Sequence, residues 1–297
     1  MGETYYEWNG SGVTTRPAAP GSVPFQTGRA RDSPLQTVLP WGHAPEAEAR
    51  MCVVALQWEP GGELPLLVAG NRDEFYERPT APLAWWEGGA ILAGRDLRAG
   101  GTWLGVSPVG RCAVLTNHRD PSLTRPDRIS RGQLPVRFLE AKDTAEAFLG
   151  ELRGEADRYN PFNLLLFDGK VLLGFESRHG RVCAFAPGIH GVSNGDFDEP
   201  WPKVEALKAG LAVAPGDDAA LLALLGDARP SPDERLPCTG VPIELERSLS
   251  PAFIRTPTYG TRASTILRLG REAVSILEQR FTFEGPEART EFKIQRA

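Results

Sequence analysis

Alternating apolar and polar residues predict two groups of β-strands, with helices between the groups and after them. Turn-rich links such as Glu59-Pro-Gly-Gly62 separate the strands of the first group. The predicted strands of this group cover 52–58, 64–70, 90–95, 102–107 and 111–117. Apolar residues spaced at i, i+3 and i+4 then predict helices over 131–140 and 143–153.

The second group of strands begins with a hairpin signal, in which Asp168-Gly169 forms the turn. Its predicted strands cover 163–167, 171–175, 181–185 and 189–193. Two further helices are expected at 202–212 and 217–226, followed by a proline-rich surface loop over 227–258. A hairpin of 263–269 and 273–283 closes the chain. This order predicts packed sheets flanked by helices.

The first 50 residues differ from this pattern, because they show no sustained period of either strand or helix. They contain six prolines, six glycines and no lysine, and such a segment buries too little apolar surface to offset its chain entropy. We therefore expect residues 1–50 to be either a disordered extension or the product of an upstream start assigned in error. The second explanation is favoured, with synthesis beginning at Met51, because the segment resembles no targeting signal. Residues 51–297 are expected to form a single domain.

Composition and charge exclude several classes of function. Hydrophobic content of 41% and charged content of 24% are typical of a soluble globular protein. The net charge of −5 gives no electrostatic reason to expect nucleic acid or an anionic membrane as a partner. No stretch of apolar residues is long enough for an integral membrane segment. The four cysteines are far apart, which predicts neither a disulfide framework nor a metal site, and a cytoplasmic location is expected.

Cys52 opens the first predicted strand and directly follows Met51. An internal cysteine in an apolar strand is most often inert core. At an amino terminus the same residue carries both a thiol and an α-amine, whose ordinary pKa of about 7.7–8.0 lets it act as the base. Whether Cys52 is ever amino-terminal therefore decides whether this chain is a candidate enzyme.

Arg72 is the candidate cation near this thiol. The turn after Trp58 makes the first two strands antiparallel, which brings the block Asn71–Glu74 back beside Cys52. Alternation sends Arg72 and Glu74 to one face of the sheet and Asn71 and Asp73 to the other. A role beside Cys52 for both Arg72 and Asp73 would then need a bulge or turn. A salt-bridged strand end explains the same charged block equally well.

A series of ordered motifs resembles the NRDE family, which is also the transport and Golgi organisation protein 2 family. The motifs span 51 to about 285 and are Met51-Cys52, Asn71-Arg72-Asp73-Glu74-Phe75, Arg78-Pro79, Trp85-Trp86, Ala93-Gly94-Arg95-Asp96, Gly100-Gly101-Thr102-Trp103-Leu104-Gly105, Thr116-Asn117, Ser130-Arg131-Gly132, Asn160-Pro161-Phe162-Asn163-Leu164, Val192-Ser193-Asn194, Pro200-Trp201-Pro202-Lys203 and Thr261-Arg262-Ala263-Ser264-Thr265. That family in turn resembles amino-terminal-nucleophile hydrolases of the choloylglycine hydrolase and penicillin V acylase group.

These resemblances imply an α+β fold, specifically a four-layer αββα sandwich, and a set of site residues. Cys52 would be the nucleophile, Arg72 would hold its thiolate, and Asp73 would accept hydrogen bonds from the α-amine. The oxyanion donor would be Asn194, with a contribution from Asn117, and Arg262 would be a second arginine near the pocket. In the hydrolase group the acid lies three residues after its arginine, where this chain has Phe75, so Asp73 or Glu74 would take its place.

The implied function is hydrolysis of a carbon–nitrogen amide bond other than a peptide, through a thioester, in a small-molecule substrate. No cofactor or metal is expected for this reaction. The alternative is a non-catalytic carrier of haem or of a lipid or acyl ligand in intracellular trafficking, with haem or another apolar ligand as the bound partner.

Overall fold

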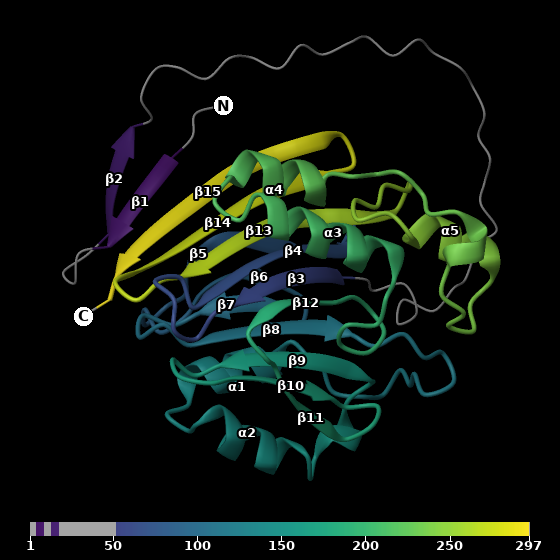
Figure 1. The fold of residues 1–297 in the computed structure, drawn as a ribbon, viewed down its shortest axis with the longest axis horizontal. Coiled ribbons are helices and arrows are strands. Elements are labelled where there is room, and N and C mark those ends of the chain that lie inside the picture. The colour runs from purple at the N-terminus through teal and green to yellow at the C-terminus, as the bar shows by residue number, and fades with distance from the viewer. Residues whose placement is uncertain (1–3, 9–12, 18–51, 297) are drawn as a thin grey trace.

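Two β-sheets lie face to face, and helices cover the outer face of each (Figure 1). The computed structural model describes residues 4–8, 13–17 and 52–296. The four-layer αββα arrangement confirms the predicted fold class. Almost all neighbouring strands are antiparallel, so the described part of the chain belongs to the α+β class.

The first sheet contains β3 and β4, near the beginning of residues 52–296, together with β13, β14 and β15, near their end. Its strands lie in the order β12-β3-β4-β13-β14-β15-β1-β2. Their bounds are β1 Thr4–Trp8, β2 Val13–Pro17, β3 Cys52–Trp58, β4 Leu66–Phe75, β12 Gly188–Val192, β13 Tyr259–Leu269, β14 Ala273–Thr282 and β15 Gly285–Gln295.

The second sheet is built from the middle of the chain, in the order β11-β10-β9-β8-β7-β6-β5. Its strands are β5 Thr80–Trp85, β6 Leu92–Asp96, β7 Leu104–Val106, β8 Cys112–Asn117, β9 Phe162–Phe167, β10 Leu172–Glu176 and β11 Arg181–Ala184.

The helices fall into two layers, one over each sheet. Helices α1 (Gln133–Glu140) and α2 (Ala145–Leu152) pack on the second sheet, whereas α3 (Pro202–Val213) and α4 (Asp218–Leu225) pack on the first (Figure 1). The short α5 (Ile243–Leu249) joins the second of these layers. No helix in the described part of the chain has the length and apolar character needed to cross a bilayer.

Strand alternation distributes the core between these layers. Along β3, Val54 and Leu56 point into the space between the sheets, whereas Val53 and Ala55 point to the layer of α3 and α4. Burial of each valine or leucine side chain stabilises the fold by roughly 1.5–3 kcal/mol. Because β3 and β4 are covered on both faces, almost every residue of the two strands is buried, including the polar ones.

Most predicted elements are present, but after residue 51 the strands β5 and β15 and the helix α5 were missed. The strand β5 includes Pro82, which a sheet tolerates at its edge, and β5 is an edge strand with an irregular register. The strand β15 is largely polar and exposed, so it lacks the apolar alternation that predicts a strand. The helix α5 has only seven residues and lies within the segment expected to be a loop.

The amino-terminal segment also differs from the expectation of no strands within 1–50. In the structure β1 pairs in parallel with β15 and antiparallel with β2. Backbone pairing with an open sheet edge accounts for these strands, because the edge of β15 presents unpaired backbone groups that another strand can satisfy. The remainder of the segment, including Met51, lies outside the described residues, so the proposed start at Met51 stays a prediction.

Candidate functional site

The hairpin of β3 and β4 places Arg72 directly opposite Cys52. The turn between the strands is closed by a hydrogen bond from the backbone nitrogen of Gly62 to the backbone oxygen of Glu59. The strand β4 continues through the block Asn71–Glu74 instead of ending before it, so this block lies within the sheet. The predicted approach of Arg72 to Cys52 is confirmed.

Alternation along β4 sends neighbouring polar side chains to opposite layers, as predicted. Arg72 faces the space between the sheets, where its guanidinium lies 4.5 Å from the ring centre of Trp103. Asn71 faces the helices and donates to the backbone oxygens of Leu225 and Ala252, at 2.8 Å each. Asp73 lies on the same side as Asn71 and accepts a 2.6 Å hydrogen bond from Thr261.

A small cavity lies at the start of β3 and has a volume of about 70 Å³. Of the six predicted site residues, Cys52, Arg72, Asp73 and Asn117 line it. The other lining residues are Glu74, Arg78, Asp96, Ala99, Gly101, Thr102, Trp103, Leu115, Ser130, Arg131 and Gly132. Most of these belong to motifs that carry the family resemblance, and the sequence assigned no role to Arg78, Asp96 or Arg131.

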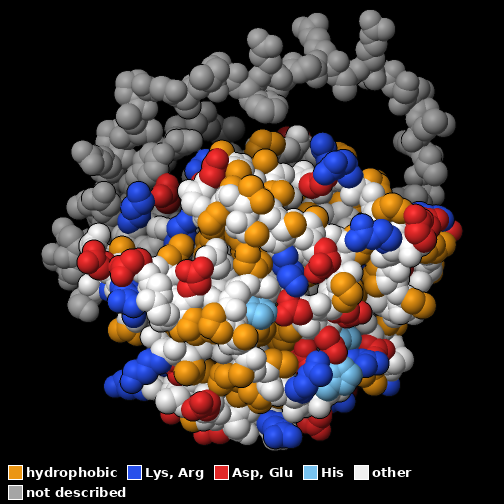
Figure 2. Space-filling model, viewed as in Figure 1, with side chains coloured by type: hydrophobic (Ala, Val, Ile, Leu, Met, Phe, Trp, Pro, Cys, Tyr) orange, Lys and Arg blue, Asp and Glu red, His pale blue; other side chains and the backbone are white. Residues whose placement is uncertain are grey.

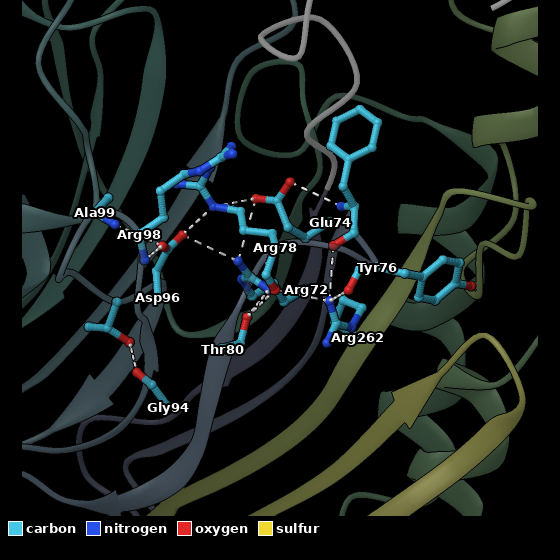
Figure 3. A network of polar contacts seen from close by, with 12 residues as sticks. Arg72, Glu74, Tyr76, Arg78, Thr80, Gly94, Asp96, Arg98, Ala99 and Arg262 are labelled. Atoms are coloured by element: carbon cyan, nitrogen blue, oxygen red, sulfur yellow. Dashed lines mark hydrogen bonds and ion pairs between the residues drawn. The ribbon is translucent and has the colours of Figure 1, made fainter.

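Arg262 does not line this cavity. It is the extra residue of a β-bulge in β13, where the register with β4 shifts between Thr261 and Ala263. Its guanidinium donates to the backbone oxygens of Phe75 and Tyr76, at 2.9 and 3.0 Å (Figure 3). Arg262 therefore holds the end of β4 in place and does not line the cavity beside Cys52.

Two arginines and two carboxylates form a buried, charge-balanced cluster beside the thiol (Figure 3). The Nε of Arg78 lies 2.7 Å from Oδ2 of Asp96, and Arg72 lies 3.4 Å from Glu74 and 3.5 Å from Asp96. Burial raises the pKa of Asp96, but the hydrogen bonds from Arg78 and from the backbone of Ala99 outweigh it and lower that pKa overall. Because Arg72 is paired with both Glu74 and Asp96, these carboxylates offset part of the stabilisation that its positive charge would give to a Cys52 thiolate.

The thiol of Cys52 is held in its neutral form. Burial raises its pKa to about 12, and the carboxylate of Asp73 adds to this rise. Arg72 and a backbone hydrogen bond from Asp73 oppose the rise without cancelling it. The charged groups that act on this thiol include Asp73, Arg72 and Glu74 from β4 and Lys203 from α3. An internal Cys52 is therefore a poor nucleophile at neutral pH.

Asn194 lies against the backbone of Cys52. Its Oδ1 is 3.4 Å from the backbone nitrogen of Cys52, and its Nδ2 donates to the backbone oxygen of Asn117 at 2.6 Å. The hydroxyl of Ser193 donates to the backbone oxygen of Cys52 at 2.8 Å. The structure thus brings Asn194 and Asn117 together at the start of β3, although Asn117 takes part through its backbone.

Asp73 has one carboxylate oxygen in use and one without a partner among the described residues. Its Oδ1 accepts from Thr261, whereas its buried Oδ2 meets no hydrogen-bond donor there. Burial raises the pKa of Asp73 to about 6, against the opposing effect of Lys203. Glu74, in contrast, is bound by Arg72 and by the backbone nitrogen of Phe75. Asp73 is therefore the acid with an oxygen available to a new donor.

Lys203 is the buried charged residue near Asp73 and Cys52 that the sequence did not single out. It is the second residue of α3, is 5% exposed, and donates to the backbone oxygen of Leu249 at 2.9 Å. A lysine in the first turn of a helix normally indicates solvent exposure. Its presence in the motif Pro200–Lys203 was the only sequence signal for it.

A second, larger cavity of about 590 Å³ is lined by Asn194, which is not among the residues that line the first cavity. His118 and His179 line it, and both contact Asp196, at 3.3 and 3.2 Å. Figure 2 shows basic and acidic side chains interspersed over the visible face, with histidine among them at the lower right. In the described part of the chain, no three His, Cys, Asp or Glu side chains are grouped closely enough to bind a metal.

Comparisons with known proteins place the chain in one family. The model of the family described as Transport and Golgi organisation 2 matches residues 51–282. The Transport and Golgi organization protein 2 homolog of Bos taurus is 34% identical over 246 residues, and that of Homo sapiens is 31% identical over the same length. Each alignment covers 73% of this chain and 88% of the relative.

Among solved structures, the Caenorhabditis elegans N-acylethanolamine-hydrolyzing acid amidase ortholog is similar at 12% sequence identity with a TM-score of 0.43. That comparison covers 73% of this chain and 92% of the amidase.

Proposed function

The chain belongs to the Transport and Golgi organisation 2 family, and on that premise we propose that it is a hydrolase whose amino-terminal nucleophile is Cys52. It would cleave a carbon–nitrogen amide bond, other than a peptide, in a small molecule through a thioester intermediate. Its relatives are named for transport and Golgi organisation. We propose that the reaction takes place in the cytoplasm and serves intracellular transport.

The observation that carries this proposal is the surroundings of the Cys52 thiol. Burial raises the pKa of the thiol to about 12, so a base must remove its proton before the sulfur can attack. A free α-amine on Cys52 would supply that base within the same residue. The backbone nitrogen that would become this amine already lies 3.4 Å from Oδ1 of Asn194. Asp73, whose buried Oδ2 has no partner among the described residues, lines the same cavity as Cys52.

The family match begins at Met51, one residue before Cys52. We therefore propose that the active form starts at Met51 and that removal of this methionine exposes Cys52. Both the family match and the motifs of the domain begin at that point, which supports this start.

In the proposed reaction, the α-amine of Cys52 takes the thiol proton and the sulfur attacks the amide carbon. General-base assistance of this kind contributes about 10²–10⁴-fold. Asn194 stabilises the oxyanion, Arg72 favours the thiolate, and Asp73 orients the amine. The α-ammonium returns its proton to the leaving amine, and water then hydrolyses the thioester to the acid and the free thiol.

The small cavity supports a small amide as the substrate. A volume of about 70 Å³ admits only a few non-hydrogen atoms beside Cys52. Its walls carry charged groups from both sheets, which favour a polar group next to the reacting carbon. The cavity beside Cys52 is too small for a haem or a long acyl chain, and the larger cavity is lined mostly by polar and charged side chains, so neither favours the carrier alternative.

The test compares the protein that begins at Cys52 with the full chain. Each is treated with p-nitrophenyl acetate, and mass spectrometry of peptides follows acetylation at Cys52, Cys112, Cys183 and Cys238. We expect selective acetylation at Cys52 in the shorter protein only, with release of p-nitrophenolate. Equal reactivity of Cys52 in both proteins would contradict the proposal. Haem or acyl-chain binding that survives Cys52→Ala, without selective acetylation, would support the carrier instead.

A further inference from the structure

The loop that carries Asn194, residues 193–198, is fixed to the second sheet although it follows a strand of the first. Nδ2 of Asn163 on β9 donates to the backbone oxygen of Gly195 at 2.7 Å. Gly195 directly follows Asn194, and the backbone oxygen of Asn194 accepts from the backbone nitrogen of Arg119 at 2.7 Å. The second sheet thus holds the loop at the residue next to the proposed oxyanion donor.

A second contact holds the same loop two residues further on. The backbone nitrogen of Phe197 donates to Oε1 of Glu176 at 2.8 Å, and Oε2 of Glu176 lies 2.5 Å from Nη2 of Arg181. Glu176 belongs to β10, where it lies directly opposite Asn163 in the pairing with β9. Both contacts to the loop therefore come from one cross-strand pair.

This pair is polar where the surrounding face of the sheet is apolar. Alternation places Asn163 on the same face of β9 as Leu165 and Phe167, which pack between the two sheets. Asn163 is 1% exposed and Glu176 is completely buried. Oδ1 of Asn163 has no hydrogen-bond partner among the described residues, and burial of such a group costs about 1–3 kcal/mol. Core packing alone does not explain the pair, because apolar side chains would fill the same space without this cost.

The backbone of the loop is strained at its end. Asp198 has a φ of 59° and is the only residue other than glycine with a positive φ in the described part of the chain. This conformation costs about 1–3 kcal/mol and persists only where the surrounding structure imposes it. Here the backbone nitrogen of Asp198 donates to the backbone oxygen of Gly191 at 2.7 Å, and its Oδ1 accepts from the backbone nitrogen of Gly191 at 2.9 Å. The loop is thus closed on β12 at its end and held from the second sheet along its length.

We propose that Asn163 and Glu176 are positioning residues that hold the loop 193–198 so that Asn194 faces Cys52. This inference rests on the proposed function, in which Asn194 stabilises the oxyanion. Both residues act through the backbone of the loop, and neither lines the cavity beside Cys52. Loss of either contact should let the loop shift, and a displacement of about 1 Å at a reacting centre can cost about 10²-fold in rate.

The test compares acetylation by p-nitrophenyl acetate with alkylation by iodoacetamide at Cys52, in the protein that begins at this residue. Asn163→Asp keeps the shape of the side chain but replaces the donor to Gly195 by an acceptor. It should slow acetylation about 10- to 10²-fold and leave alkylation nearly unchanged, because only acetylation develops an oxyanion. A folded Asn163→Asp protein with the acetylation rate of the unsubstituted protein would overturn the inference, and so would equal slowing of both reactions.

Asn160→Asp is the matched control. Nδ2 of Asn160 donates to the backbone oxygen of Arg125 at 2.8 Å, so the same substitution removes a similar bond from a loop that does not carry Asn194. It should leave both rates unchanged. Slowing of acetylation by Asn160→Asp as large as that by Asn163→Asp would contradict the inference.

Two variants of Glu176 decide the case in which Asn163→Asp does not fold. Glu176→Ala removes the acceptor for the backbone nitrogen of Phe197 and should slow acetylation selectively. Glu176→Gln keeps an acceptor oxygen at this place and should restore most of the rate. Equal acetylation rates in the two variants would overturn the inference.

The outcomes separate this inference from the proposed function. Selective acetylation of Cys52 that Asn163→Asp and Glu176→Ala leave unaltered would reject the two positioning residues and leave the proposed function intact. No acetylation of Cys52 in the unsubstituted protein that begins at this residue would reject the proposed function and the inference together.

Discussion

The backbone nitrogen of Cys52 lies 3.4 Å from Oδ1 of Asn194, although 142 positions separate the two residues in the sequence. The pairing of β12 with β3 produces this approach, because Val192, the last residue of β12, lies opposite Val54 and Asn194 follows two residues later. The same pairing brings Ser193 to the backbone oxygen of Cys52.

Replacement of Asn194 should separate two kinds of reaction at Cys52. Asn194→Ala should slow acetylation by p-nitrophenyl acetate about 10²- to 10³-fold, because that reaction develops an oxyanion. Alkylation by iodoacetamide develops no oxyanion and should change little. The measurement compares both rates in the protein that begins at Cys52. Equal slowing of the two reactions would indicate that Asn194 only shapes the site.

Replacement of Cys52 by alanine should abolish hydrolysis of any amide that the protein turns over. The thiol is the proposed nucleophile, and Cys112, Cys183 and Cys238 do not line the cavity. Cys112→Ala is the matched control, because Cys112 is equally buried in a strand but lies in the core between the sheets. Full activity of Cys52→Ala would exclude the thioester route.

Replacement of Arg72 should lower the stability of the fold strongly. Arg72→Gln leaves Glu74 and Asp96 with one buried cation fewer, at a cost of about 3 to 5 kcal/mol in the free energy of unfolding. Arg158→Gln removes an exposed ion pair with Glu155 and should cost less than about 0.5 kcal/mol. Urea denaturation measures both. Similar costs for the two variants would contradict the charge-balanced cluster.

Glu278 should make stability depend on pH. It is buried on β14, accepts a 2.8 Å hydrogen bond from the backbone of Leu83, and has its pKa raised by burial to about 7. The folded state therefore holds a proton that the unfolded state loses near its ordinary pKa of about 4.3. Stability contributed by this group is fully present below that value and falls as pH rises towards 7.

Glu278→Gln keeps the hydrogen-bond acceptor and removes the titration. Relative to the unchanged protein, the variant should gain about 3 kcal/mol in the free energy of unfolding between pH 4 and pH 8. Urea denaturation at a series of pH values follows this difference. A difference that stays constant with pH would show that the pKa of Glu278 is the same in the folded and the unfolded protein.

The sequence predicted the parts of the fold that repeat a simple pattern. Alternation gave the strands 52–58 and 111–117 almost to the residue, and the turn after Trp58 gave the hairpin that sets Arg72 beside Cys52. Elements with weak patterns were missed, as the edge strand β5 and the short helix α5 illustrate. Their formation depends on contacts with the completed sheets and less on local preference.

Only those contacts of the candidate site that are made within one hairpin could be predicted from the sequence. The nearness of Arg72 follows from one hairpin, whereas Asn194 was placed by family resemblance because its approach requires the β12–β3 pairing. The position of Arg262 depends on a bulge that no local signal marked. The environment of Lys203 depends on how α3 packs on the sheet, which alternation does not report.

The most direct test of the central claim is the mass of the amino-terminal peptide of the protein isolated from the cells that make it. We predict a peptide that begins at Cys52 with a free α-amine. A peptide in which Met51 remains joined to Cys52, in protein that hydrolyses an amide, would contradict the account, because Cys52 would then have no amine to act as its base.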